Sequence, residues 1–195
     1  QNHVSLLGSD EIGALKEAAA ENEIRFPIVG MYPSFHLEGE KRRQELHRFD
    51  EMIKIGGRLG FDLLKVMPGG VSSEDMTPDV WDRSVSFVRE VLSRTHQWGV
   101  DIAFELHGGT VADDPETLLR FFDEVGSERL KVCWQPLGFQ STEPAIELYD
   151  RLSDRVAHLH LQGRRDGEMT LLKDAEIDYR EVLGHMFDEG FDGYV

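Results

Sequence analysis

Residues 99–110 read Gly-Val-Asp-Ile-Ala-Phe-Glu-Leu-His-Gly-Gly-Thr (GVDIAFELHGGT). This stretch predicts a buried β-strand that ends in polar residues and a glycine loop. Because side chains on a strand point alternately to its two faces, the even-numbered residues 102–106 form one apolar face. The other face places Glu105 and His107 at the C-terminal end of the strand. A strand that only builds a core does not need this carboxylate and imidazole, so the stretch predicts one wall of an active site.

Other short apolar runs predict strands beside this one, and amphipathic segments between them predict helices. Thr77-Pro78 and Asp114-Pro115 are typical helix starts, with a capping side chain followed by proline. We expect further strands at residues 24–32, 62–67, 130–135 and 156–162, with the start of another at 193–195. We expect helices at residues 9–22, 41–59, 78–98, 115–125, 144–152 and 178–189.

The alternation of strand and helix, at a spacing of roughly 30 residues, is typical of βαβ units and predicts an α/β fold with a parallel sheet. No glycine-rich nucleotide-binding motif follows any expected strand, which favours a barrel over an open doubly wound sheet. We therefore expect a (β/α)8 TIM barrel. The chain accounts for about six of the eight strands, so residues 1–195 are expected to form one partial domain that lacks the first strands and the end of the last. Its exposed sheet edges should make the isolated chain prone to aggregate.

The composition narrows the class of partner. The formal charge of −16, from 21 basic and 37 acidic residues, argues against nucleic acid as a partner. There is no apolar run of membrane-spanning length and no signal-peptide pattern in the sequence. The single cysteine, Cys133, favours a reducing, cytoplasmic setting. The expected partner is a small molecule, and association into a homo-oligomer stays open.

The same alternation rule, applied to the other strands, places more polar residues on the inward face. A carboxylate, imidazoles and an amide oxygen that converge from separate strands suit acid–base chemistry or a divalent metal. Cys133 is expected to be a small core residue, and Arg164, just after a strand, either holds an anionic group or is simply solvated. The residues expected at the inward rim are Lys65, Glu105, His107, Gln135, His158, His160 and Gln162.

On these residues the chain resembles the xylose isomerase-like TIM barrel superfamily, the sugar phosphate isomerase/epimerase group that also includes endonuclease IV. The motifs that carry the resemblance are 104–110 (FELHGGT), 130–136, 156–160 (VAHLH) and 177–194. The resemblance implies a divalent metal (Mn, Mg, Zn or Co) held by a glutamate, an aspartate, a histidine and a second glutamate. The matching positions are Glu105, Gln135 and His160, and the second glutamate would follow Val195. Gln135 brings no negative charge, which weakens the attraction for a dication.

The first hypothesis for function is therefore a sugar or polyol isomerase or epimerase that uses metal-assisted proton transfer. Glu105 would be a metal ligand or the general base. The residues expected to contact the substrate are His107, Lys65, His158 and Arg164. One alternative is a barrel that binds a sugar without turning it over. Another is an endonuclease IV-like phosphodiesterase, which the negative charge disfavours.

Overall fold

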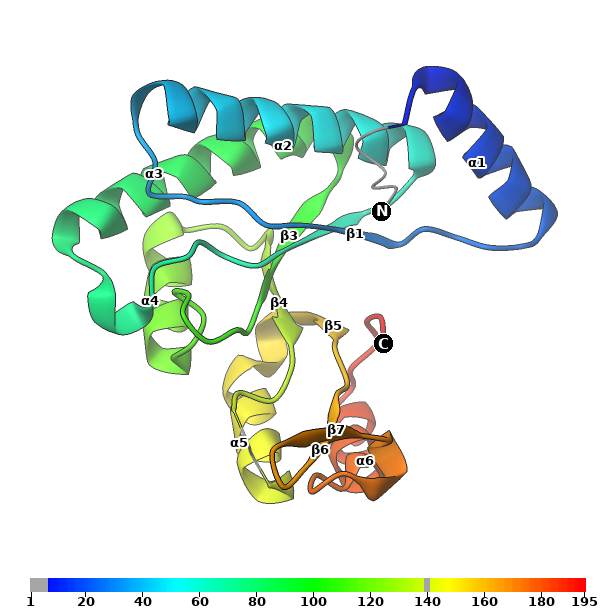
Figure 1. The fold of residues 1–195 in the computed structure, drawn as a ribbon, viewed down its shortest axis with the longest axis vertical. Helices are drawn as coiled ribbons and strands as arrows, with labels where there is room; N and C mark the ends of the chain where they lie inside the picture. The colour runs from blue at the N-terminus through cyan, green and yellow to red at the C-terminus, as the bar shows by residue number, and fades with distance from the viewer. Residues whose placement is uncertain (1–6, 139–140) are drawn as a thin grey trace.

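The computed structural model describes residues 7–138 and 141–195, which form a curved parallel sheet with helices along its outer side (Figure 1). The sheet has five strands in the order in which they occur in the chain. The strands are β1 (Ile28–Met31), β2 (Leu63–Val66), β3 (Asp101–Glu105), β4 (Leu130–Trp134) and β5 (Val156–Leu159). After β5, His158 forms a parallel bridge to Tyr194, at the position expected for a sixth strand. This order and curvature are those of an incomplete (β/α)8 barrel, which confirms the predicted fold class.

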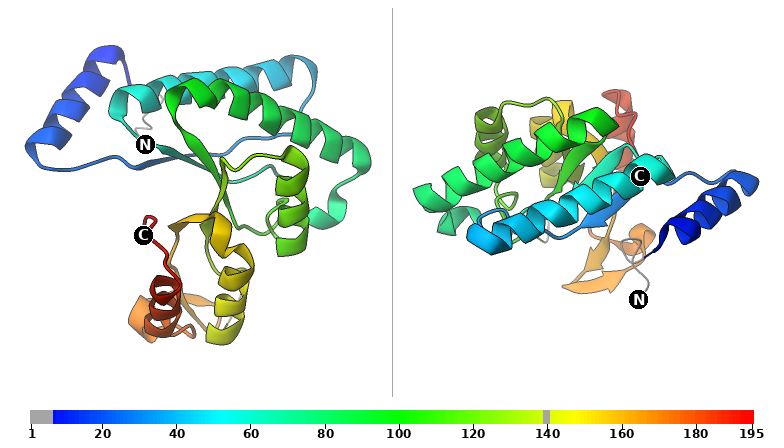
Figure 2. Two further views of the ribbon diagram at one scale, coloured as in Figure 1. Left: turned by 180° about the vertical axis from the view of Figure 1, so that it is seen from behind. Right: turned by 90° about the horizontal axis from the view of Figure 1, so that it is seen from above.

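Helices follow the strands and cover the convex side of the sheet, as the two further views show (Figure 2). The helices are α1 (Ser9–Glu21), α2 (Gly39–Leu59), α3 (Pro78–Thr95), α4 (Pro115–Val125), α5 (Thr142–Leu152) and α6 (Tyr179–Asp188). Short 3₁₀ turns are η2 (Ser73–Asp75), η3 (His96–Trp98), η4 (Ser153–Arg155) and η5 (Leu172–Asp174). No helix in the described parts of the chain is long and apolar enough to cross a membrane.

The predicted helix starts are confirmed by their capping contacts. The Thr77 side chain accepts a hydrogen bond from the backbone nitrogen of Val80 at 3.3 Å, and Asp114 Oδ2 accepts one from Thr117 at 2.8 Å. Gly60, with φ of 84°, ends α2 in the left-handed conformation that glycine adopts without strain. These local signals explain why the helix boundaries follow from the sequence so closely.

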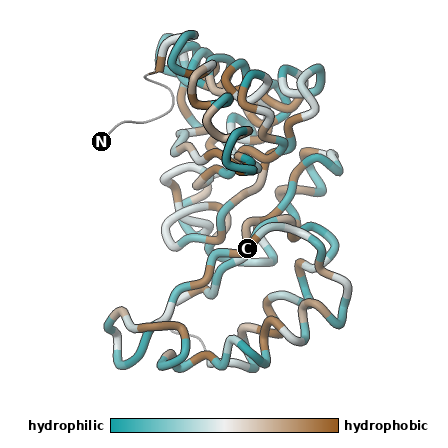
Figure 3. The backbone as a smooth tube through the Cα atoms, turned by 90° about the vertical axis from the view of Figure 1, so that its right-hand side faces the viewer, coloured by the Kyte–Doolittle hydropathy of each residue, from teal (hydrophilic) through white to brown (hydrophobic). Residues whose placement is uncertain are grey.

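Two layers of apolar side chains hold the barrel wall. The outer layer lies between sheet and helices, where Phe104 of β3 packs against the rings of Phe35, Phe121 and Phe122 at 5.3–5.9 Å. The inner layer is small and consists of Leu63, Ala103 and Cys133. Along the helices, polar and apolar residues alternate in Figure 3, as expected of helices with one buried face. The inner layer leaves the end of the barrel interior to the polar residues of the site.

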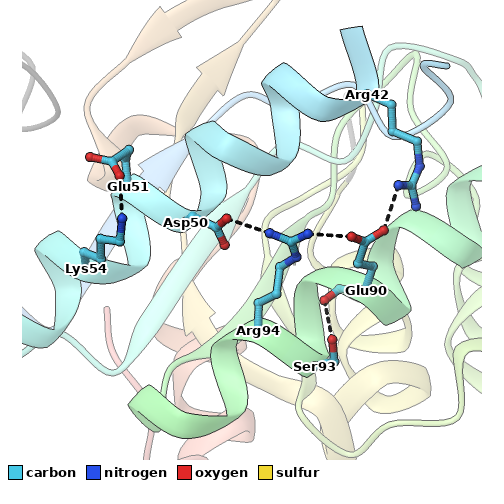
Figure 4. A network of polar contacts seen from close by, with 7 residues as sticks. All are labelled: Arg42, Asp50, Glu51, Lys54, Glu90, Ser93 and Arg94. Atoms are coloured by element: carbon cyan, nitrogen blue, oxygen red, sulfur yellow. Dashed lines mark hydrogen bonds and ion pairs between the residues drawn. The ribbon is translucent and has the colours of Figure 1, made fainter. Parts of the chain in front are cut away.

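Ion pairs also tie α2 to α3 on the outside of the barrel (Figure 4). Glu90 of α3 accepts from Arg42 at 2.7 Å and from Arg94 at 2.6 Å, and Arg94 also reaches Asp50 of α2 at 2.6 Å. Partly exposed pairs of this kind contribute little singly, but a shared network fixes the relative position of the two helices. These helices support β2 and β3, which carry two residues of the site.

One expectation about the strands was wrong, and one pair of strands was not predicted. Strand β3 ends at Glu105, so His107 lies in the following loop and not on the strand. An unpredicted antiparallel hairpin, β6 (Gly163–Arg165) and β7 (Glu168–Thr170), follows β5. Its two-residue turn is Asp166-Gly167, both with positive φ, which is a common hairpin signal that the sequence contains.

The bridge between β5 and Tyr194 depends on a glycine with no room for a side chain. A Cβ atom at Gly193 would lie 2.4 Å from the backbone oxygen of Ala157. We therefore expect Gly193→Ala to lower the free energy of unfolding by about 1–3 kcal/mol, because the backbones must move apart. Gly184→Ala is the matched control, since its Cβ would meet open space in α6 and should stabilise by up to about 1 kcal/mol. Urea unfolding of both variants tests this, and equal effects would contradict it.

Candidate functional site

The centre of the candidate site is a buried ion pair between neighbouring strands. Lys65 of β2 donates from Nζ to Glu105 Oε2 of β3 at 2.6 Å, and each side chain is 10% exposed. The contact follows from the register, because Lys65 lies opposite Ala103, on the same face as Glu105. The flexible lysine side chain then extends along that face from the level of Ala103 to Glu105. The inward placement of both residues agrees with the prediction from alternation.

His160 provides the second partner of Glu105. Its Nδ1 lies 3.0 Å from Glu105 Oε1. His160 directly follows β5, which is separated from β3 by β4, so the curvature of the sheet brings the two side chains together. Each carboxylate oxygen of Glu105 thus has one hydrogen-bond partner, and we call Lys65, Glu105 and His160 the central triad.

The electrostatic surroundings keep Glu105 ionised. Burial raises the pKa of this carboxyl, but hydrogen bonds from His160 and Lys65 outweigh it and lower the pKa to about 2. Burial, together with the neighbouring His160, lowers the pKa of His158 to about 4, so its imidazole is neutral near pH 7. Burial and the charge of Glu105 raise the pKa of the Cys133 thiol. At neutral pH Glu105 is therefore a carboxylate, held by hydrogen bonds on both of its oxygens.

Two members of the triad, Glu105 and His160, border an open hollow of about 760 Å³ on the concave side of the sheet. Its wall includes Glu105, Gln135, His158 and His160, and the hairpin strand β7 closes one side. A small void of about 20 Å³ lies nearby and is lined in part by Gln135, Gln162 and Arg164. The hollow lies at the C-terminal ends of the strands, where (β/α)8 enzymes carry their active sites.

The structure gathers only some of the predicted site residues. His107 is exposed, and its Nδ1 lies 2.8 Å from the backbone oxygen of its neighbour Gly108. Arg164 is part of β6, and its Nε donates to Gln162 at 2.9 Å. Among the described residues, those that line the hollow beside Glu105 include neither His107 nor Arg164. Their roles in substrate binding stay predictions.

His158 and Gln135 lie at the hollow itself. The His158 ring meets the His160 ring edge to face at 4.7 Å, and its Nδ1 lies 3.2 Å from the backbone oxygen of Tyr194. The Gln135 side chain donates to the backbone oxygen of Leu106, which fixes its orientation. Both residues are therefore held in place at the wall, as substrate-contacting groups need to be.

Cys133 has a neighbourhood that sequence reasoning missed. It is fully buried, as predicted for a core residue, but its sulfur and one nitrogen of each of His158 and His160 lie within 4.8 Å of one another. Thiolate and imidazole are donors that suit zinc. The proximity arises because Cys133 pairs with His158 across β4 and β5, after a register shift in the ladder. No local sequence signal predicts this pairing of Cys133 with His158.

The residues that the family resemblance implies as metal ligands do not fit a divalent cation in this arrangement. Glu105 brings the only carboxylate of the three, and the Lys65 ammonium at 2.6 Å already balances it. Gln135 is neutral, and the Nδ1 of His160 contacts Glu105, which leaves only its Nε2 for a metal. Dications are normally held by several anionic oxygens. Metal binding by Glu105, Gln135 and His160 thus stays a prediction, and the charges around Glu105 argue against it.

The lowered pKa of His158 predicts a dependence of stability on pH. Below about pH 6.5 the unfolded chain binds a proton at His158 that the folded chain does not, so stability falls as pH drops towards 4. His158→Gln should remove up to about 3 kcal/mol of this decline. Urea unfolding between pH 4 and 7 measures it, with His47→Gln on the exposed side of α2 as control. An unchanged slope in the His158 variant would contradict the prediction.

Comparison with known proteins supports the fold independently. The model of the family described as "Xylose isomerase-like TIM barrel" matches residues 2–195. Inosose dehydratase of Lacticaseibacillus casei is 19% identical over an alignment of 177 residues, and the match covers 80% of this chain and 59% of that enzyme. Fructoselysine 3-epimerase of Escherichia coli O157:H7 is 24% identical and covers 93% of this chain and 72% of the enzyme. The chain thus spans little more than half of the first relative's length.

Solved structures with the same fold include a D-tagatose 3-epimerase-like protein, with a TM-score of 0.80 and 19% identity over 96% of this chain and 75% of that one. A Mycobacterium smegmatis protein described in complex with magnesium has a TM-score of 0.75 and 15% identity, covering 98% and 72%. The IOLI protein, described with a bound zinc, has a TM-score of 0.66 and 17% identity, covering 93% and 71%. At these identities the likeness establishes the fold.

Proposed function

We propose, on the premise that this chain belongs to the xylose isomerase-like TIM barrel family, that it acts in the isomerisation or epimerisation of a sugar or polyol. Relatives named as epimerase and dehydratase of sugar-like compounds support this substrate class. In the proposed reaction a proton moves at a carbon next to a carbonyl group, and Glu105 is the group that moves it.

The observation that carries the proposal is the position of Glu105. It is a buried carboxylate at the C-terminal end of a barrel strand, held from both sides and bordering an open hollow. An isolated buried carboxylate would be costly, so the chain gives it two hydrogen-bond partners. Catalytic carboxylates in barrels occupy this position, and their supporting residues come from neighbouring strands.

Each member of the triad has a chemical role in this proposal. The Lys65 ammonium donates to the carbonyl oxygen of the sugar and stabilises the negative charge that develops there. When the substrate oxygen accepts from another N–H group of Lys65, the hydrogen bond from Lys65 to Glu105 weakens, so the pKa of the carboxyl and its basicity rise. His160 keeps the carboxylate oriented through its contact with Oε1. Glu105 then takes the proton from one carbon and returns it to the neighbouring carbon, which is an isomerisation; an epimerisation requires in addition a proton donor on the opposite face of the sugar.

The second candidate is a barrel that binds a sugar and does not turn it over. Two observations favour it: the pKa of Glu105 is lowered to about 2, which makes a weak base, and Glu105 is the only carboxylate side chain among the described residues that line the hollow. A phosphodiesterase has less support, because the net charge of −16 repels a nucleic acid backbone.

Exchange of the carbon-bound hydrogen of a sugar with solvent distinguishes the enzyme from the binding protein. The full chain is incubated in deuterated water with a panel of ketoses, aldoses and inososes, and NMR follows deuterium at the carbon next to the carbonyl. Exchange above the rate without protein supports the enzyme, even where the sugar is already at equilibrium. Thermal stabilisation by a sugar with no exchange supports the binding protein instead. Neither exchange nor stabilisation by any sugar would remove both.

A further inference from the structure

We propose that the ammonium of Lys65 takes the place of the divalent cation at Glu105, so that the central triad functions without a metal. This deepens the proposed function, because it concerns the same site and names the group that faces the substrate oxygen. The substrate class it implies is a neutral sugar or polyol with a carbonyl group, bound through its oxygen to an ammonium donor. The inference rests on how Lys65 is held, on the charges around Glu105 and on the identity of residue 135.

The side chain of Lys65 packs between Gly30 and the ring of Tyr32. Strand β1 places Gly30 opposite Lys65, and a Cβ atom at Gly30 would come within 3.2 Å of Lys65 Cε and 3.7 Å of Nζ. On another side, the Tyr32 ring lies 5.4 Å from Nζ, a distance typical of a cation–π contact. The missing side chain at position 30 and the ring at position 32 together fix the ammonium next to Glu105.

The charge around Glu105 is already balanced. Lys65 and Glu105 form one buried pair at 2.6 Å, with each side chain 10% exposed. A dication at the carboxylate would face this ammonium at close range, and repulsion between two cations is strong in a buried site. The position that the family fills with an aspartate holds neutral Gln135, so no second carboxylate from that strand offsets the added charge.

The ammonium also retains a donor for a ligand. Lys65 has three N–H groups, of which one points to Glu105 and one side of the group faces the Tyr32 ring. The remaining donor matches the oxygen of a carbonyl or of the enediolate formed from it. An ammonium in this place supplies the positive charge that a metal would otherwise bring to the reacting oxygen.

Manganese titration tests the inference without any sugar. Free Mn²⁺ is measured by electron paramagnetic resonance in the presence of excess Mg²⁺, which suppresses weak binding to the acidic surface. Mn²⁺ prefers oxygen and imidazole donors, so it reports on the Glu105 site and not on the Cys133 thiol. The proteins compared are the unchanged chain, Lys65→Gln, Gln135→Asp and the double variant Lys65→Gln/Gln135→Asp. Lys54→Gln is the matched control, since it removes an exposed lysine–glutamate pair of similar length, 2.7 Å.

We expect no stoichiometric Mn²⁺ binding by the unchanged chain, Gln135→Asp or Lys54→Gln. The double variant should bind Mn²⁺ at least roughly tenfold more tightly than the unchanged chain does. Stoichiometric binding by the unchanged chain would overturn the inference. If the Lys65 variants fail to fold, Gln135→Asp decides: tight binding with Lys65 present would show that the ammonium does not exclude the metal. A failure here leaves the deuterium exchange result, and so the proposed function, unaffected.

Discussion

Glu105→Gln is expected to lower the rate of sugar hydrogen exchange or isomerisation by roughly 10²- to 10⁴-fold, the range found when a general acid–base group is removed. The amide has nearly the same shape and can still accept from Lys65 or His160, but it cannot take up a proton from carbon. Binding should change much less than turnover, because the wall of the hollow stays in place. Initial rates with the best sugar of the panel, together with the dissociation constant from thermal stabilisation, separate these two effects.

Glu51→Gln is the control for this measurement. Glu51 forms an exposed pair with Lys54 at 2.7 Å on α2, outside the barrel wall. Its substitution should leave both rate and binding unchanged. If Glu105→Gln exchanges hydrogen as fast as the unchanged chain, Glu105 is not the proton-transferring group.

Lys65→Met is expected to lower the free energy of unfolding at pH 7 by roughly 3–5 kcal/mol, the cost of leaving one member of a buried ion pair without its partner. Methionine fills the space of the lysine stem but leaves the Glu105 carboxylate buried and facing only His160. The loss should shrink as pH falls from about 4.5 to the folded pKa of Glu105, about 2, because the protonated carboxyl needs no cation. Urea unfolding with a constant slope measures the difference.

The double variant Lys65→Met/Glu105→Gln tests the reason for this loss. It removes both charges and keeps an acceptor for His160, so it should recover most of the lost stability. A double variant as unstable as Lys65→Met alone would show that packing of the lysine stem, and not the charge, stabilises the fold.

The sequence predicted those features of the fold that local chemistry determines. Thr77 and Asp114 cap their helices as expected, and alternation along the strands correctly placed Lys65 and Glu105 on one inward face. The apolar face of β3 is buried under the helices, with Phe104 fully inaccessible. Periodicity and capping act within a few residues, so they can be read without knowing what lies across the sheet.

Most of the features that were missed depend on distant pairing. Alternation could not show that β3 ends at Glu105, which places His107 in an exposed loop. It also could not show which of the polar rim residues touch, since the contact of Glu105 with His160 needs the curvature of the whole sheet. The position of Cys133 beside His158 follows from a register shift between β4 and β5. The hairpin after β5 was missed although its Asp166-Gly167 turn is a local signal.

The buried pair has a consequence for how such sites diverge. A change from glutamine to aspartate at position 135, or from lysine to an uncharged residue at position 65, leaves an unbalanced charge when it occurs alone. The double change leaves two carboxylates that a divalent cation can balance, whereas neither single change does, so the two positions should show epistasis. Relatives with aspartate at the position of Gln135 are expected to carry an uncharged residue at that of Lys65. Gly30 should vary with them, because a smaller or shorter residue at position 65 releases the space that now requires a glycine.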